Sequence, residues 1–150
     1  EAISGNLYYD RVSAFGFRKE NIFVFNHEKA DDFAKLDIDC IYISGGNTFG
    51  TLDKIKKCGF DKRIVEYVKS GVIYIGGSAG AHIVTQSIEH VQRYDSNDVY
   101  LDNFDGLGLL DGVLVGHYTY RRRYDYEELC QQGKYKVYYL TDDDSLVYEK

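Results

Sequence analysis

Short apolar runs alternate along the chain with segments in which apolar residues recur every three or four positions. Runs rich in β-branched and aromatic residues indicate strands, and the wider spacing indicates one face of a helix. The pattern predicts strands at residues 21–26, 39–46, 72–77 and 112–118, and helices at residues 28–36, 47–59, 61–71 and 79–88. Asn47 or Thr48 is suited to cap the second helix, and Gly59 is suited to end it.

The alternation of strands and helices predicts parallel strands joined by right-handed crossovers, and hence a three-layer α/β/α sandwich with a mostly parallel sheet. Residues 72–77 are apolar throughout, which predicts cover on both faces of that strand. Residues 136–150 alternate on either side of an Asp-rich turn and predict a C-terminal β-hairpin. We expect one α/β domain over residues 1–150. Because the chain has no Met and residues 1–20 show no clear strand, we expect its native N-terminal strand to be missing.

Composition narrows the class of partner. The 150 residues carry a formal net charge of -6, which argues against a protein that binds a nucleic-acid backbone. No apolar run approaches the roughly 20 residues that span a bilayer. The three cysteines include no CxxC pair, which fits reduced thiols. We therefore expect a cytoplasmic protein that binds neither nucleic acid nor membrane.

Three predicted strands end in residues that can carry chemistry. Ligands of open α/β sheets bind beyond the carboxyl ends of the strands. The pairs Gly45-Gly46 and Gly76-Gly77 and the side chain of His117 lie at such ends. We expect these three strand ends to meet at one edge of the sheet, and their convergence is a stronger indication of a site than any one motif.

Ser78 lies in the pattern G-x-S-x-G, which runs from Gly76 to Gly80. A serine on a sharp strand-to-helix turn needs small neighbours, which is the logic of the nucleophile elbow. The amides of Ala79 and of Gly46 are candidate donors to an oxyanion. The serine could equally be a helix cap or part of a turn that cradles a phosphate, and Asn47 could be a substrate contact or a plain cap.

A nucleophilic serine needs a base and an acid that orients the base. Of the four histidines, His27, His82, His90 and His117, the last ends a strand after an apolar run and is favoured as the base. The acids between Ser78 and His117 are Glu89, Asp95, Asp98 and Asp102, and nothing local singles one out. Glu89 is our expected acid, with Asp95 next.

Other chemistries lack their motifs. The sequence contains no HExxH, no paired CxxC and no EF-hand loop, so we expect no metal, and it contains no GxGxxG or GxxxxGK[ST] loop, so we expect no cofactor. The basic run Arg121 to Arg123, among tyrosines, is a solvated loop or a clamp for a charged substrate.

The segments "GGNTF", "GGSAGA" and "GLGLLDGVLVGHY" together resemble the S51 serine peptidases, the peptidase E family, over residues 39–118. The resemblance implies a class I glutamine-amidotransferase-like fold, Ser78 as nucleophile, His117 as triad histidine and the GGN segment as part of the oxyanion site. The family's aspartate lies in a segment like "TTNDMP", where direct counting here reaches Arg93. The family's substrate-selecting arginine falls in the acidic stretch "YDYEELC", and Arg121 is the expected substitute.

These observations predict a serine peptidase that hydrolyses short peptides through an acyl-enzyme. One alternative is a related amide hydrolase, such as a cyanophycinase-like enzyme. Another is a non-catalytic binding member of the same fold. The expected partner is a small peptide substrate, and a homodimer is left open.

Overall fold

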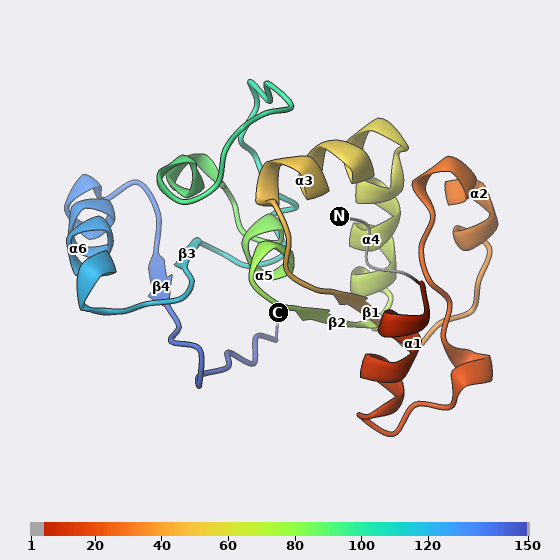
Figure 1. The fold of residues 1–150 in the computed structure, drawn as a ribbon. Helices are drawn as coiled ribbons and strands as arrows, with labels where there is room; N and C mark the ends of the chain where they lie inside the picture. The colour runs from red at the N-terminus through yellow and green to blue at the C-terminus, as the bar shows by residue number, and fades with distance from the viewer. Residues whose placement is uncertain (1–4, 150) are drawn as a thin grey trace. The chain divides into compact units, whose positions relative to one another are not determined.

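The computed structural model describes residues 5–149 and divides into two compact units, Glu1–Leu36 and Asp37–Lys150 (Figure 1). Helices and parallel strands make up the second unit, which confirms the α/β class. All the residues that we expected to act in the site lie in this second unit.

The first unit consists of short helices. They are α1 (Gly5–Ser13), η1 (Lys19–Asn21), η2 (His27–Lys29) and α2 (Ala30–Phe33). The strand predicted at residues 21–26 is wrong, because residues 22–26 have neither helical nor strand structure. A strand needs a neighbour to take its backbone hydrogen bonds, and the described part of this unit contains none. The ring of Phe25 instead packs edge-to-face on Phe33, with ring centroids 5.1 Å apart.

Two parallel strands, β1 (Cys40–Ile43) and β2 (Ile73–Gly76), form the first strand pair of the second unit. The connection between them contains α3 (Thr48–Lys57) and α4 (Phe60–Lys69). Gly59 joins the two helices with φ +72°, a left-handed conformation that glycine adopts without a Cβ penalty. The predicted order of strand, helix, helix and strand over residues 39–77 is confirmed.

Helix α3 begins as its sequence predicts. The side chain of Asn47 accepts a hydrogen bond from the Gly50 amide at 2.8 Å, which satisfies one of the unpaired donors of the first turn. Phe49, Leu52 and Ile55 form its buried face. This helix therefore has both its start and its packing face encoded locally.

Strand β2 is covered on one face only. Ile73 is 63% exposed and Ile75 is 46% exposed, so the predicted cover on both faces is wrong. Successive strand residues point to opposite faces, and the intervening Tyr74 points toward α5 (Ala79–Ile83), where its hydroxyl donates to the Gly80 carbonyl at 2.7 Å. An uninterrupted apolar run thus does not by itself tell which faces are covered.

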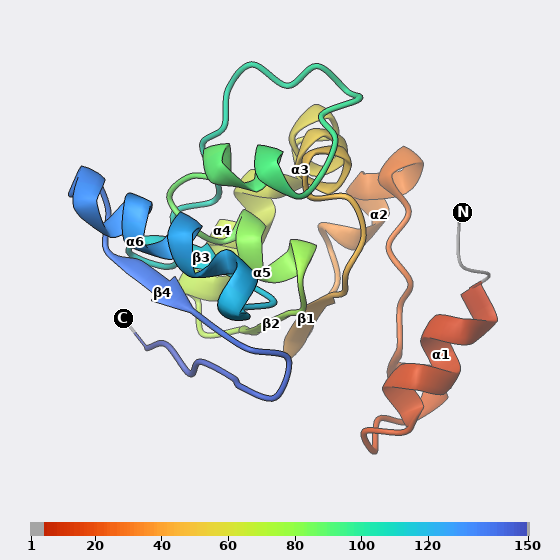
Figure 2. The ribbon, with the colours of Figure 1, turned by 60° about the vertical axis from the view of Figure 1, so that its left-hand side comes forward.

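The second strand pair consists of β3 (Val113–Val115) and β4 (Val137–Tyr139), which run parallel with Val113 opposite Val137 (Figure 2). Their connection contains η4 (Tyr120–Arg122) and α6 (Arg123–Gln132). The predicted C-terminal hairpin is wrong, because β4 pairs with β3 and residues 140–149 contain no strand. A polarity pattern indicates a strand but does not give the direction of its partner.

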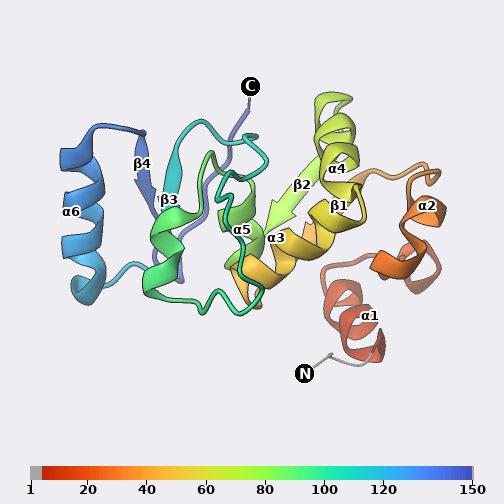
Figure 3. The ribbon, with the colours of Figure 1, turned by 90° about the horizontal axis from the view of Figure 1, so that it is seen from above.

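Helix α5 lies between the two strand pairs and contacts β1, β2 and β3 (Figures 1 and 3). The chain then forms the short helix η3 (Glu89–Arg93). The apolar part of the core beside α5 includes Phe49, Ile83, Val113 and Val115, none more than 1% exposed. The ends of both strand pairs are thereby held around one helix.

Among residues 5–149, no helix is long and apolar enough to cross a membrane.

Replacing Gly80 by Ala is expected to destabilise the second unit although it adds a better helix former. A Cβ at this position would lie 2.1 Å from the Ile43 carbonyl oxygen of β1, so the helix or the strand must move. We expect a loss of about 1–3 kcal/mol in the free energy of unfolding, the cost typical of overpacking, measured by urea denaturation. Gly77→Ala is the matched control, because a Cβ there meets nothing within 4 Å. Equal stability of the two variants would contradict the prediction.

Candidate active site

Ser78 lies on the turn between β2 and α5 with φ 49° and ψ −111°, a backbone conformation that non-glycine residues rarely adopt. The flanking glycines make this turn possible. A Cβ on Gly76 would lie 2.6 Å from the Gly80 carbonyl oxygen, and a Cβ on Gly80 would collide with β1. The first and last glycines of the G-x-S-x-G pattern are therefore required by close backbone contact, and the serine side chain projects from the turn.

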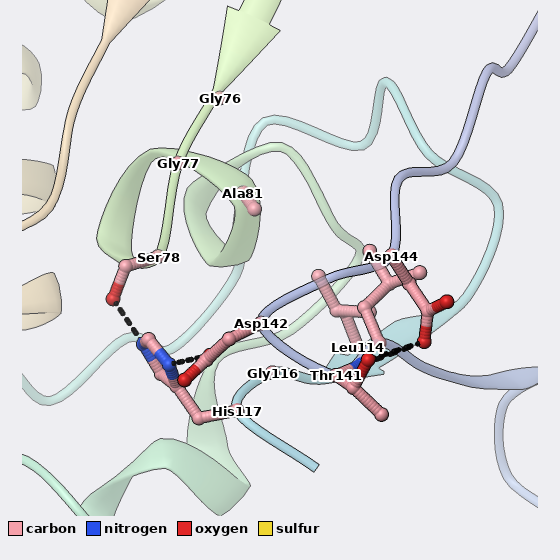
Figure 4. Close-up of a pocket in the computed structure, with 11 residues that line it drawn as sticks. Gly76, Gly77, Ser78, Ala81, Leu114, Gly116, His117, Thr141, Asp142 and Asp144 are labelled. Carbon is pink, nitrogen blue, oxygen red and sulfur yellow. Dashed lines mark hydrogen bonds and ion pairs between the residues drawn. The ribbon is translucent and has the colours of Figure 1, made fainter.

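His117 faces this serine. It follows β3, and its Nε2 atom lies 2.9 Å from Ser78 Oγ (Figure 4). In the tautomer in which Nε2 accepts the serine proton, Nδ1 carries a proton and is a donor. The structure thus brings together two residues that are 39 positions apart in the sequence.

A carboxylate completes the arrangement. Asp142 Oδ1 lies 2.5 Å from His117 Nδ1, and Figure 4 shows the two side chains directed at each other. Ser78, His117 and Asp142 form the geometry of a nucleophile, a base and an orienting acid. The side chains of His117 and Asp142 are 48% and 77% exposed, so this pair is open to solvent.

The structure does not bring Glu89 to His117. Its carboxylate lies 3.9 Å from Lys134 Nζ and is exposed. Asp95 is also occupied elsewhere, because its Oδ2 atom accepts a hydrogen bond from the Thr48 amide at 2.8 Å, at the start of α3. Sequence reasoning missed Asp142, which follows β4 in "TDDDS". Had β4 been predicted to run parallel to β3, this acidic segment would have been expected at the same sheet edge as His117.

The Gly45-Gly46 segment lies against the serine. A Cβ on Gly45 would lie 3.3 Å from Ser78 Cβ, and Gly46 has φ +147°. Asn47, which we expected to contact substrate, has both ends of its side-chain amide engaged within the protein. Its Oδ1 caps α3, and its Nδ2 donates to the Ser96 carbonyl at 2.8 Å. Its observed contacts are those of a cap.

Two other histidines are buried behind the site. His90 Nε2 lies 2.7 Å from the Leu114 carbonyl oxygen, so it donates there and holds β3. His82 is 4% exposed, and burial followed by the neighbouring His90 lowers its pKa to about 4, which keeps it neutral near pH 7. Its Nε2 atom would lie 3.1 Å from a Cβ on Gly116, the residue before His117. His27 belongs to the first unit.

The arginines of η4 have different environments. Arg121 is exposed and is not among the described residues that line the pocket beside Ser78. Arg122 is half-buried, and its Nη1 atom donates to the Gly116 carbonyl oxygen at 2.5 Å. Its guanidinium is therefore engaged with the backbone beside His117.

A pocket of about 220 Å³ opens beside Ser78 and His117 (Figure 4). Asp142 and Asp144 contribute its charged lining, and no lysine or arginine of the described chain lines it. Hydrogen bonds from the Thr141 hydroxyl and amide lower the pKa of Asp144, which keeps this carboxylate ionised. The pocket beside the serine is consequently negative.

The sequence profile of peptidase family S51 matches residues 9–150, which include all three residues of the arrangement. The chain belongs to peptidase family S51. Two similar proteins come from bacteria. An uncharacterised peptidase of Listeria monocytogenes is 36% identical over 72% of this chain and 55% of its own length. A peptidase E of Shewanella amazonensis is 32% identical over 91% of this chain and 56% of its own.

A solved structure extends the comparison to the fold of this S51 family member. The crystal structure of a protein provisionally named peptidase E, from Listeria monocytogenes, has a TM-score of 0.65 and 32% identity, and the match covers 79% of this chain and 59% of that one. The S51 chain thus spans little more than half the length of the curated relatives compared here.

Proposed function

We propose that this S51 chain is a serine-type peptidase in which Ser78 is the nucleophile, His117 the general base and Asp142 the orienting acid. The observation that carries the proposal is the 2.9 Å contact between Ser78 Oγ and His117 Nε2, with Asp142 on the other ring nitrogen. Membership of a peptidase family supports the same chemistry.

The reaction follows from these positions. Ser78 Oγ attacks the peptide carbonyl carbon while His117 Nε2 takes the hydroxyl proton, and the C–N bond then breaks as the imidazolium protonates the leaving amine. Water next attacks the acyl-serine ester, gives a proton to His117, and the serine oxygen leaves with that proton. Asp142 stabilises the imidazolium in both halves of the reaction.

The oxyanion of each tetrahedral intermediate is proposed to be held by two backbone amides. The Ala79 amide follows the nucleophile directly, at the start of α5. The Gly46 amide belongs to the segment whose neighbour Gly45 packs against Ser78. Removing one such donor typically costs about 10²–10³ in rate.

We also propose a more specific fold than the α/β class. Two parallel strand pairs with helix-containing connections support a three-layer α/β/α sandwich of the class I glutamine-amidotransferase-like type, and the turn at Ser78 supports the same assignment. In such a sandwich the strand ends that carry Gly46, Ser78 and His117 share one edge.

The pocket favours substrates without negative charge near the scissile bond. Asp144 and Asp142 repel a substrate carboxylate and attract the amino group of a short peptide or a basic side chain. Specificity for an N-terminal aspartate, by contrast, would call for a cation in the pocket. We therefore propose short peptides with neutral or basic N-terminal residues as substrates.

A dipeptide panel tests the substrate class. We expect Ala-X and Lys-X to be hydrolysed faster than Asp-X and Glu-X, with kcat/KM higher by a factor of about two to five because the charges are exposed to solvent. The measurement is released amine at constant ionic strength, with labelling by a fluorophosphonate probe as the check for an active serine. Faster hydrolysis of the acidic dipeptides would contradict the proposed specificity, and a protein that neither labels nor hydrolyses any member would contradict the peptidase.

A further inference from the structure

We propose that Arg122 and Tyr94 are positioning residues that hold the Gly116–His117 peptide and thereby set the orientation of the His117 imidazole. This inference rests on the proposed function, since it assigns a role in the same reaction. Arg122 contacts the backbone before His117, and Tyr94 contacts the Arg122 guanidinium.

The backbone at His117 needs an external restraint. Its φ is 48°, a left-handed conformation that costs a non-glycine residue on the order of 1–2 kcal/mol and persists only when the surroundings impose it. On the C-terminal side, the Tyr118 amide donates to the Leu140 carbonyl at 2.8 Å, which ties the chain to the residue after β4. On the N-terminal side, the Leu140 amide donates to the Val115 carbonyl at 3.1 Å, and the Gly116 carbonyl that follows accepts its hydrogen bond from a side chain.

Arg122 is the side chain that holds the Gly116 carbonyl. Its Nη1 atom donates to the Gly116 carbonyl oxygen at 2.5 Å, and a charged donor makes a stronger hydrogen bond than a neutral one. The Cζ atom lies 3.8 Å from the centroid of the Tyr94 ring, within the range of a cation–π contact. The guanidinium is thus held between a carbonyl oxygen and an aromatic face, and its direction is determined by both.

Tyr94 is itself fixed by a network of hydrogen bonds. Its hydroxyl donates to Asp125 Oδ2 at 2.6 Å, and Arg93 donates to the other oxygen of Asp125 at 2.6 Å and to Glu128 at 2.9 Å. Burial opposes ionisation of Asp125, but the hydrogen bonds from Tyr94 and Arg93 outweigh it and lower its pKa. The ring on which Arg122 rests is therefore anchored to α6.

His82 also packs against Gly116. His82 Nε2 lies where a side chain on Gly116 would begin, 3.1 Å from an ideal Cβ, and His82 is buried. Gly116 is consequently in contact with both the His82 ring and the Arg122 guanidinium. Of these two contacts, the one from Arg122 is a hydrogen bond to the Gly116 carbonyl, and loss of Arg122 removes it.

The test combines kinetics with a direct view of the His117 ring. We expect Arg122→Gln to lower kcat and the rate of fluorophosphonate labelling by about tenfold or more while KM changes less than about twofold, because misplacement affects the transition state more than binding. Nitrogen-15 NMR of the imidazole should show a smaller share of the Nδ1-protonated tautomer. Arg122→Lys keeps a charged donor but loses the planar stacking on Tyr94, so its kcat should lie between those of the wild type and Arg122→Gln.

Two further variants separate positioning from charge and from folding. Arg123→Gln removes the same charge one residue away, where the side chain pairs with Glu127 of its own helix, and should leave kcat and the His117 tautomer unchanged. Tyr94→Leu keeps the Arg122 charge but removes the aromatic face, and should reproduce the Arg122→Gln effect in a protein that circular dichroism shows to be folded.

The outcomes for the two proposals are distinct. An unchanged His117 tautomer with unchanged kcat in Arg122→Gln, or an equal loss in Arg123→Gln, would overturn the positioning role. A wild-type protein that shows the Arg122-dependent tautomer but neither labels nor hydrolyses peptides would overturn the peptidase and leave the positioning role supported.

Discussion

Ser78→Ala is expected to abolish peptide hydrolysis, with kcat reduced by about 10⁴-fold or more, because a triad without its nucleophile retains only the contribution of binding and oxyanion stabilisation. Labelling by a fluorophosphonate probe, followed as a mass increase of the intact chain, should vanish at the same time. The methyl group of alanine also removes the 2.9 Å contact with His117 Nε2 without adding bulk to the strained turn.

A serine outside the site provides the control for this variant. Ser70 follows α4 as its C-cap, its hydroxyl donates to the Tyr67 carbonyl at 2.7 Å, and Ser70→Ala should retain activity within about twofold. Full hydrolysis by a folded Ser78→Ala protein would show that another group attacks the substrate. Loss of hydrolysis with labelling retained at a different serine would move the nucleophile to that residue.

Asp142→Asn is expected to lower kcat by about 10²-fold or more while the fold is retained. The asparagine amide can donate to His117 Nδ1, which favours the tautomer with the proton on Nε2, and that tautomer cannot accept the proton of Ser78. The 77% exposure of Asp142 makes the expected effect smaller than for a buried acid, because water can partly take its place. The measurement is kcat and the labelling rate across pH 5–9.

Two substitutions make the assignment of the acid specific. Asp143→Asn removes the same charge from the adjacent residue, which does not line the pocket, and should change kcat by less than about twofold. Glu89→Gln tests the acid that the sequence favoured. A large loss in Glu89→Gln together with an active Asp142→Asn would return the role to Glu89.

Several parts of this protein could be predicted because their determinants are local. Asn47 caps α3 through a contact three residues away, and Gly59 ends it in a left-handed conformation. The elbow at Ser78 is likewise encoded by its own glycines, although the reason for each glycine became visible only with the carbonyl oxygen that it approaches. The strand predicted at residues 21–26 was wrong because a local pattern cannot show whether a partner strand is present, and a strand forms only with a partner.

The sequence by itself determined the set of elements from residue 40 to residue 83 and the candidates Ser78 and His117. These could be predicted because capping, turn conformation and apolar spacing depend on neighbouring residues. Only the tertiary structure decided which acid meets His117. The pattern of "KVYYL" is the same for a parallel and an antiparallel strand, and the choice rests on long-range packing of β4 beside β3. That pairing carries Asp142 to the sheet edge, and the contacts of Arg122 with Gly116 and Tyr94 depend on the same packing of distant segments.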